Sequence, residues 1–472
     1  MYCGYVTNIK NLRPHPNADR LDLGECFGNT VCVGRWEYAE GDVILYFPTD
    51  GQLSEEFCAQ HDLVRRKDEN GNPAGGYLEP GKRNIRAIRL RGEKSDGLVM
   101  PLSCLAYTGV NLDELKVGDQ ITTINGHEIC QKYIPRSNVR HGHCSSGNKT
   151  RKVKVPTAPL FSEHADTEQL AYNLGAFKSG DEIEITLKMH GTSQRTGYLP
   201  VLQGYKRSLW DRICGRTGSP IYDWGDISGT RRVVLDSYEG GFYGSNAFRE
   251  QHSKTFEGKL MKGETVYYEV VGFTDTGAPI MSSASNKKLN DKEFVKQYGE
   301  ETVFSYGCSP FSPQEQVAGM RQAGFTGEDI CKTAEFMKPQ SDVYVYRMTM
   351  TNEDGFVVEY TPDFMRYRCE QMGVKTVPLL WKGTIPEHPG SKDDPTITAG
   401  EWINNVVEQF YDGPDPIGKT HIREGVVVRI INRPKFCAYK HKNFAFKVLE
   451  GLIKDTAEAP DMEESQEVSD NE

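Results

Sequence analysis

Short apolar runs bounded by glycine and proline recur through the first 130 residues of this 472-residue chain. Thr30–Val33 and Val43–Phe47 are two such runs, and their β-branched and aromatic residues favour short strands. Many short strands joined by tight turns are typical of small barrels, in which a sheet closes on itself. We therefore expect residues 1–130 to form a β-rich domain of the small-barrel type.

The segment His15-Pro16-Asn17-Ala18-Asp19-Arg20-Leu21 resembles the opening of the OB-fold tRNA-binding modules attached to some aminoacyl-tRNA synthetases. The resemblance implies an OB-fold β-barrel at residues 1–130, and OB-folds bind nucleic acid on one barrel face. Arg89 and Arg91 are two residues apart, so on a strand they would share a face. We expect this pair to contact nucleic acid; a merely solvated strand is the alternative.

Changes in composition divide the rest of the chain. Residues 131–154 hold seven basic residues and no acidic one, which predicts a basic interdomain linker that either follows a phosphate backbone or is only solvated. Residues 155–454 mix strand and helix signals, with helical spacing at 401–411 and no clear signal at 274–340, which reads as an insertion. Residues 455–472 carry eight acidic residues and no basic one, which predicts a disordered acidic tail.

Cysteine usage and hydropathy indicate a cytoplasmic protein. The 12 cysteines include no C-x-x-C pair and read as reduced thiols. No apolar run approaches the roughly 18 residues that a membrane span needs, and the N-terminus has no secretory signal pattern. His141-Gly142-His143-Cys144 places its ligands too close together for a standard zinc site, so we favour a plain loop there.

Residues 182–189 alternate apolar and other side chains with a period of two, which predicts a half-buried strand. Lys188 falls on the face opposite the buried one, at the end of this strand, and Gly191 follows in a turn. A glycine turn lets backbone N–H groups approach a ligand closely. Lys188 is therefore expected to be held in place and exposed to a ligand.

Three later segments strengthen this interpretation. Tyr267–Phe273 reads as a strand that carries Glu269, and Arg423–Arg429 as a strand opened by Glu424 and a glycine. Tyr439–Asn443 carries Lys440 and Lys442, which a strand would aim at one place. Lysines and carboxylates on neighbouring strands predict a pocket for a phosphate-bearing nucleotide and a divalent cation.

In this order the segments resemble motifs I, III, IV and V of the covalent nucleotidyltransferase superfamily, which comprises polynucleotide ligases and mRNA capping enzymes. Lys-x-His-Gly-Thr at 188–192 is similar to the RNA ligase 2 type, because DNA ligases and capping enzymes usually have Asp where His190 stands. One departure is Ser193, where RNA ligase 2 relatives often carry Asn.

Two further segments and the layout extend the resemblance. Ser228–Arg232 resembles motif Ia, through either Arg231 or Arg232, and Tyr344–Arg347 resembles motif IIIa, through Tyr346 or Tyr344. An OB-like module precedes the motifs and the chain stops soon after motif V, which is similar to the Deinococcus-type RNA ligases. The implied fold class is α+β: an OB-fold barrel followed by a nucleotidyltransferase domain of antiparallel sheets flanked by helices, at 155–454.

The resemblance implies an ATP-dependent RNA ligase that works in three steps. Lys188 attacks the α-phosphate of ATP to give a lysyl-AMP, AMP passes to an RNA 5′-phosphate, and a 3′-OH then displaces AMP. A free lysine titrates near about 10.4, so cations and a bound metal are expected to lower the pKa of Lys188. The expected partner is RNA with 3′-OH and 5′-phosphate ends in a nicked duplex, in RNA break repair, with no membrane or protein partner.

The resemblance also assigns the other site residues. Glu424 would hold Mg²⁺ or Mn²⁺, Glu269 would contact the ribose or the metal, and Tyr346 would stack on the adenine. The full set of expected nucleotide-binding residues is His190, Gly191, Arg231, Arg232, Glu269, Tyr346, Lys440 and Lys442.

Other functions remain open at this point. One alternative is another covalent nucleotidyltransferase, either a DNA ligase or a GTP-using capping enzyme. The other is a non-catalytic RNA-binding protein, which would leave the segments around Lys188 unexplained.

Overall fold

The computed structural model describes residues 2–67, 70–134, 156–165, 167–214, 217–231, 233–235, 238, 246–281, 285–289, 292–333, 337–390 and 396–455. The chain forms two compact units. Residues 2–134 and the C-terminal helix α9 (Phe444–Asp455) form unit 1, and residues 156–443 form unit 2. Three predicted segments fall largely outside the described residues. They are the plain loop at 141–144, most of the linker and almost all of the tail.

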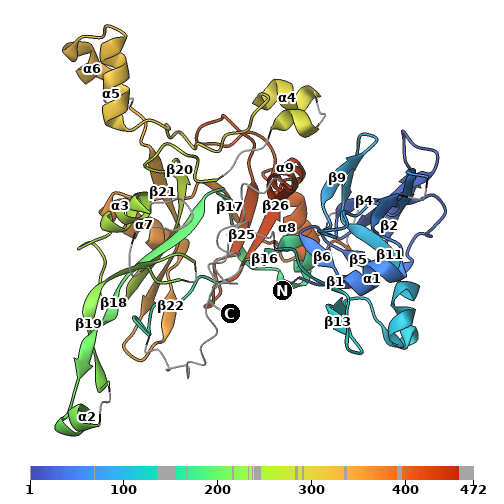
Figure 1. Ribbon diagram of the computed structural model, residues 1–472, viewed down its shortest axis with the longest axis horizontal. Coiled ribbons are helices and arrows are strands. Elements are labelled where there is room, and N and C mark those ends of the chain that lie inside the picture. Colours follow the sequence, from blue (N-terminus) through green and yellow to red (C-terminus); the bar gives the residue numbers. More distant parts are fainter. Residues whose placement is uncertain are drawn as a thin grey trace. The chain divides into compact units, whose positions relative to one another are not determined.

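Unit 1 consists of short antiparallel strands, as the glycine and proline spacing predicts (Figure 1). A four-stranded sheet has the order β11-β5-β1-β12, and a three-stranded sheet has the order β2-β3-β4. The other described strands of this unit form four two-stranded sheets. The strands are β1 (Gly4–Asn8), β2 (Lys10–Pro14), β3 (Leu21–Cys26), β4 (Asn29–Gly34), β5 (Val43–Phe47), β6 (Gly51–Leu53), β7 (Arg65–Lys67), β8 (Pro73–Gly75), β9 (Ala87–Leu90), β10 (Glu93–Asp96), β11 (Leu98–Pro101), β12 (Gln120–Ile121), β13 (Thr123–Ile124), β14 (His127–Glu128) and β15 (Cys130–Lys132).

The core of unit 1 lies between these sheets and helix α1 (Glu55–Gln60). Inward residues of the strands, such as Val6, Leu45 and Phe47, are fully buried there and pack with Phe57 of the helix. The strands are shared among separate sheets, so the described residues do not form one continuously hydrogen-bonded barrel. The predicted OB-fold class is nevertheless confirmed for this unit, together with the α+β class of the whole chain.

The expectation that Arg89 and Arg91 share a strand face is wrong. Strand β9 ends at Leu90, and Arg91 begins a two-residue turn to β10 in which Arg91 and Gly92 both have positive φ, 45° and 95°. Such a turn matches the twist of a tight hairpin, so the chain reverses where the alternation was expected to continue. The contact of either arginine with nucleic acid remains a prediction.

Helix α9 packs on this same hairpin. The guanidinium of Arg89 lies 5.6 Å, and Nζ of Lys94 5.5 Å, from the ring centroid of Phe444. Lys447 is 2.6 Å from the buried carboxylate of Asp96. The predicted division placed 444–454 with the second domain, whereas the helix takes its place in unit 1 because its apolar and basic residues face this hairpin.

Unit 2 contains two larger sheets. A five-stranded sheet has the order β16-β26-β25-β17-β24, and a six-stranded sheet the order β19-β18-β20-β21-β22, with β23 added beside β21. All pairs are antiparallel except β16 with β26 and β21 with β23. The strands are β16 (Glu168–Gln169), β17 (Glu182–Leu187), β18 (Thr192–Lys206), β19 (Ser219–Gly229), β20 (Glu264–Gly272), β21 (Ser341–Thr351), β22 (Val357–Glu359), β23 (Lys375–Thr376), β24 (Leu379–Thr384), β25 (Gly425–Ile430) and β26 (Ala438–Lys442).

Helices cover the sheets of unit 2. Helix α8 (Ala399–Val407) buries Ile403 and Val407 against the five-stranded sheet. Helices α3 (Ala247–Lys254) and α7 (Pro362–Met372) bury Phe248 and Met365 against the six-stranded sheet. The region 274–340 contributes α4 (Lys292–Tyr298), α5 (Pro313–Gln322) and α6 (Gly327–Thr333).

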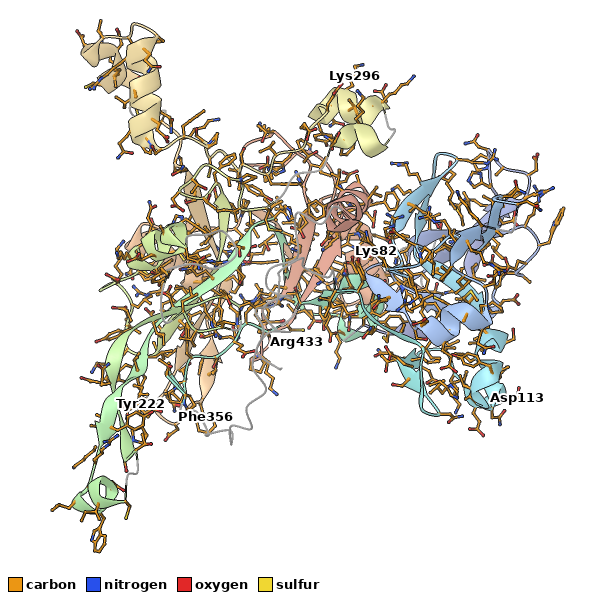
Figure 2. The ribbon with its side chains drawn as sticks, in the orientation of Figure 1. Lys82, Asp113, Tyr222, Lys296, Phe356 and Arg433 are labelled. Carbon is orange, nitrogen blue, oxygen red and sulfur yellow. The ribbon has the colours of Figure 1, made fainter. Side chains whose placement is uncertain are left out.

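Strands β18 and β19 continue past their sheet as a two-stranded ribbon, on which Figure 2 shows Tyr222. The ribbon ends in α2 (Leu209–Ile213), whose apolar side chains are exposed. The cysteines of the described residues are all free thiols, as expected. Among the described residues no helix is long and apolar enough to cross a membrane.

Candidate active site

Lys188 directly follows strand β17, next to the start of β25 and the end of β26. Its backbone N–H donates to the carbonyl of Gly425 over 3.0 Å, and Gly425 pairs with Lys442 in the sheet register. The predicted strand is confirmed over Glu182–Leu187, where Ile183 and Ile185 are fully buried. Glu184 on the opposite face is also buried, so the strand is more deeply buried than predicted. Three neighbouring strand ends therefore bring Lys188, Glu424 and Lys442 together.

The side chain of Glu424 is the centre of this cluster. Its Oε1 lies 2.6 Å from Nζ of Lys188 and 3.7 Å from Nζ of Lys442, and its Oε2 lies 3.5 Å from Nδ1 of His190. Glu424 is 3% exposed, whereas the Lys188 side chain keeps 23% of its surface exposed. The predicted nucleophile thus reaches solvent while its amine is held by a buried carboxylate.

The charge of Glu424 is set by these neighbours. Burial alone would raise the pKa of this carboxyl group, but Lys188, His190 and Lys442 outweigh the burial and lower the pKa to about 2. The carboxylate is therefore ionised at neutral pH.

Glycine is required at two positions around the cluster. A Cβ at Gly191 would lie 2.4 Å from the carbonyl oxygen of Val270 and 2.9 Å from Cγ of Glu269. A Cβ at Gly425, where φ is 145°, would lie 2.1 Å from the carbonyl oxygen of His441. Only glycine lets these backbones approach so closely, and the approach at Gly191 brings Glu269 beside the turn that follows Lys188.

The turn is supported from the region 274–340. The backbone N–H of His190 donates to the hydroxyl of Tyr306 over 2.7 Å, and the imidazole of His190 packs edge-on against Phe304, with ring centroids 4.4 Å apart. Tyr306 and Phe304 in turn contact the buried ring of His421. Burial raises the pKa of Tyr306 well above its usual value, so its hydroxyl stays protonated. Part of the predicted insertion therefore shapes the site.

A pocket opens beside Lys188, between the two sheets of unit 2. It is open to solvent, and charged, polar and aromatic side chains line it. Four of the predicted site residues line it: Lys188, Arg231, Glu269 and Tyr346. The pocket and the cluster around Glu424 meet at Lys188, and charged side chains contribute to both.

A β-bulge gives Tyr344 and Tyr346, the two candidate stacking residues, different positions. Tyr268 pairs with Val345 and Tyr267 with Arg347, so Tyr346 is the extra residue in β21. A bulge re-aims the side chain that it carries. Tyr346 lines the pocket and its hydroxyl lies 2.9 Å from Oγ of Ser193, whereas Tyr344 is buried and is not among the residues that line the pocket.

The remaining predicted residues are placed less fully. Arg231 lines the pocket, and Arg232 lies outside the described residues. Lys440 and Lys442 both lie on β26, as predicted, and Nζ of Lys442 lies 3.7 Å from Oε1 of Glu424. The roles of all these residues in binding stay predictions.

Sequence reasoning missed several residues of the pocket. Glu184 is 2% exposed and forms a bidentate pair with Arg366 of α7, with distances of 2.6 and 3.0 Å. His164 and Arg429 also line the pocket. Glu184 carried one signal, since an acidic residue within a buried strand needs a partner, but nothing in the sequence identified Arg366 as that partner.

The donors present fit a divalent cation delivered with a nucleotide. Oε2 of Glu424 is buried and accepts no hydrogen bond from the described residues. Mg²⁺ binds through one or two carboxylates together with substrate phosphates and water, so it needs no complete protein cage. Among the described residues no group of three or more His, Cys, Asp or Glu side chains is arranged to hold a metal ion by itself.

Comparisons with known proteins agree with this architecture. A family model for an OB-fold domain matches residues 4–102. No curated protein matches the chain in sequence. Among solved structures, the RNA ligase of Naegleria gruberi matches in several states at 15% sequence identity. A Lys-to-Ala variant with ATP and Mn has a TM-score of 0.53 and covers 97% of this chain and 100% of that one.

Two more states of the same protein match similarly. The RNA ligase with PPi gives a TM-score of 0.52 at 15% identity, covering 94% of this chain and 98% of that one. A Lys-to-Met variant with AMP and Mn gives a TM-score of 0.52 at 15% identity, and it covers 97% of this chain and 99% of that one. The chain shares the fold of this RNA ligase. At this identity the similarity establishes the fold alone, over nearly the whole of both chains.

Proposed function

We propose that the protein is an ATP-dependent RNA ligase. One observation carries the proposal: the amine of Lys188 stands at the junction of an open pocket and a buried cluster of Glu424, His190 and Lys442. The RNA ligase of the same fold is known with ATP, AMP, PPi and Mn, which supports nucleotide and metal use here.

In the first step the Lys188 nitrogen attacks the α-phosphorus of ATP. A P–N bond forms, the P–O bond to pyrophosphate breaks, and the amine gives up its proton. Lys442 and Arg231 stabilise the negative charge of the transferring phosphoryl group, where electrostatic effects dominate. Tyr346 stacks on the base, and Glu269 contacts the ribose or the cation.

Glu424 and Glu269 would hold Mg²⁺ or Mn²⁺, which when bound would neutralise charge on the phosphates. The RNA 5′-phosphate then takes AMP from Lys188 as the P–N bond breaks. The 3′-OH finally attacks that activated phosphate, a phosphodiester forms, and AMP leaves. The proposed substrate is RNA with 3′-OH and 5′-phosphate ends in a nicked duplex, joined in the cytoplasm during break repair, with Arg89 and Arg91 of the OB-fold unit contacting it.

A labelling experiment tests the proposal. The full chain is incubated with α-labelled ATP or GTP and Mg²⁺ or Mn²⁺, and the protein is resolved on a denaturing gel. Label from ATP alone, absent in Lys188→Ala and present in the exposed control Lys254→Ala, is expected. Mass spectrometry then maps AMP to Lys188. Label only from GTP would indicate a capping enzyme, and no label from either nucleotide would indicate a non-catalytic RNA-binding protein.

A further inference from the structure

His164 is a pocket residue that the proposed chemistry does not use. It lines the pocket beside Tyr346, with ring centroids 5.0 Å apart and an interplanar angle of 63°. Its ring also packs against Tyr267 and Phe436, each at a centroid distance of 5.6 Å. Three aromatic neighbours therefore fix the orientation of the imidazole.

Arg347 fixes the tautomer of this imidazole. Nη1 of Arg347 lies 3.3 Å from Nδ1 of His164, and a guanidinium group can only donate hydrogen bonds. Nδ1 must therefore accept, which leaves the ring proton on Nε2. Arg347 is itself held by Glu359, whose carboxylate oxygens lie 3.0 and 3.1 Å from Nε of the arginine.

The surroundings also keep the ring neutral. Burial and then the positive charges of Arg347, Arg231, Arg195 and Arg429 lower the pKa of His164 well below its usual value. A neutral imidazole with its proton on Nε2 is a hydrogen-bond donor at that atom and carries no charge to attract phosphate.

The donor at Nε2 is available to a ligand. Within the part of the chain that the structure describes, the polar contact of His164 is the one through Nδ1, and Nε2 is not among the buried polar atoms that lack a partner, so this atom of the half-buried ring is accessible. The residue faces the open pocket. A donor that is fixed in place and left unpaired selects ligands that present an acceptor to it.

We propose that His164 is a specificity-determining residue, whose Nε2–H donates a hydrogen bond to a ring nitrogen of the purine bound in this pocket. The inference rests on the proposed function, because it takes a nucleotide to be the ligand of the pocket. The purine is the fitting acceptor, because the ring of His164 lies next to Tyr346, the residue proposed to stack on the base. Adenine presents acceptors at N1, N3 and N7, whereas N1 of guanine carries a proton.

Nucleotide analogues that lack one ring nitrogen test this contact. Dissociation constants are measured for ATP, 1-deaza-ATP, 3-deaza-ATP, 7-deaza-ATP and 2′-deoxy-ATP, using the full chain with Lys188→Ala so that no AMP is transferred. With His164 present, one deaza analogue is expected to bind about tenfold more weakly than ATP. When His164→Phe is added to this protein, ATP is expected to bind more weakly by a similar factor. The affinity of that analogue is expected to stay the same, since its contact with His164 is already absent.

Two controls make the result specific. His164→Phe retains an aromatic ring against Tyr346, and thermal unfolding shows whether the variant is folded. His388→Phe, an exposed histidine, is expected to leave every affinity unchanged. The inference is overturned if His164→Phe leaves the ratios of the deaza-analogue dissociation constants to that of ATP unchanged. It is also overturned if only the ratio for 2′-deoxy-ATP changes in this variant.

The failure of this inference is distinguishable from failure of the proposed function. Label transfer from ATP to Lys188 in the unmodified protein is measured first. If label forms and the analogues show no coupling to His164, the inference alone is wrong. If no label forms with any nucleotide, the proposed function is wrong and the inference falls with it.

Discussion

Nζ of Lys188 lies 2.6 Å from Oε1 of Glu424, so the residue proposed as the nucleophile forms an ion pair with a buried carboxylate. An amine in such a pair cannot attack phosphorus until the carboxylate finds another partner. A nucleotide that arrives with a divalent cation offers one, because the cation competes with the lysine for Glu424. The proposed reaction therefore requires this ion pair to open before Lys188 attacks ATP.

The first prediction concerns Glu424. Glu424→Gln keeps the shape of the side chain but removes the charge that would hold the cation. We expect the rate of AMP transfer to Lys188 to fall by about 100-fold at saturating ATP. Single-turnover labelling measures this rate. A rate within twofold of the unmodified protein would show that the charge of Glu424 is not needed for AMP transfer.

The second prediction concerns Tyr306, which accepts a hydrogen bond from the backbone of His190. Tyr306→Phe leaves this buried N–H without its acceptor, which costs about 1–3 kcal/mol and loosens the turn after Lys188. We expect the rate of AMP transfer to fall about tenfold while the KM for ATP changes little. Tyr298→Phe, in the same region of the chain, is the control and should behave like the unmodified protein. Equal losses in both variants would refute a positioning role for Tyr306.

The third prediction concerns the close backbone approach at Gly191. Gly191→Ala would place Cβ 2.4 Å from the carbonyl oxygen of Val270, so the turn or strand β20 must move. We expect AMP transfer to be lost while unit 1 stays folded. Gly225→Ala is the matched control, since its Cβ would meet Val201 at an ordinary 3.6 Å. Full activity in Gly191→Ala would mean that the approach is not needed for the reaction.

The fourth prediction is a dependence of stability on pH. Burial lowers the pKa of His252 to about 4, from an unfolded value of about 6.5, and its Nε2 lies 2.8 Å from Oγ of Ser341. Between these two values the unfolded chain binds a proton that the folded chain does not. The stability that neutral His252 provides is therefore complete above about pH 6.5 and is lost as the pH falls toward 4.

Urea unfolding at pH 7.5 and pH 5.0 measures this effect. His252 alone should account for about 2 kcal/mol of the loss between these values. His252→Gln should reduce the loss by that amount, although His164 and His421 retain their own lowered pKa values in the variant. The exposed His388→Gln should show the full loss. If His252→Gln lost as much stability between pH 7.5 and pH 5.0 as the unmodified protein, the pKa of His252 would not be lowered by folding.

The strand-based part of the site was predictable because it follows from local patterns. A period of two fixed which face of β17 is buried, and the order of the lysine and glutamate segments identified three adjacent strand ends. Features that depend on contacts distant in sequence were not predictable. Tyr306 meets His190 across 116 residues, and no periodicity marks it.

Backbone irregularities were the other source of error. The turn at Arg91 interrupts an alternation that looks continuous in the sequence. The bulge at Tyr346 likewise separates two tyrosines that a regular strand would place on one face. The turn reverses the chain where the strand was expected to continue, whereas the bulge adds one residue to the strand pairing. A single sequence reveals neither change.

The bulge leads to the last prediction, which compares the two tyrosines of β21. Tyr346 lines the pocket, so Tyr346→Ala should weaken ATP binding by about 10-fold or more, since base stacking on an aromatic ring contributes about 1–3 kcal/mol. Tyr346→Phe keeps the ring and loses the hydroxyl contact with Ser193, so its affinity should stay within about threefold. Tyr344→Ala removes a buried ring and should lower the unfolding temperature without changing the affinity of the folded fraction. Equilibrium ATP binding and thermal unfolding separate these outcomes. The opposite result, weaker binding in Tyr344→Ala and unchanged binding in Tyr346→Ala, would contradict the role given to the bulge. Tyr344 and not Tyr346 would then contact the base.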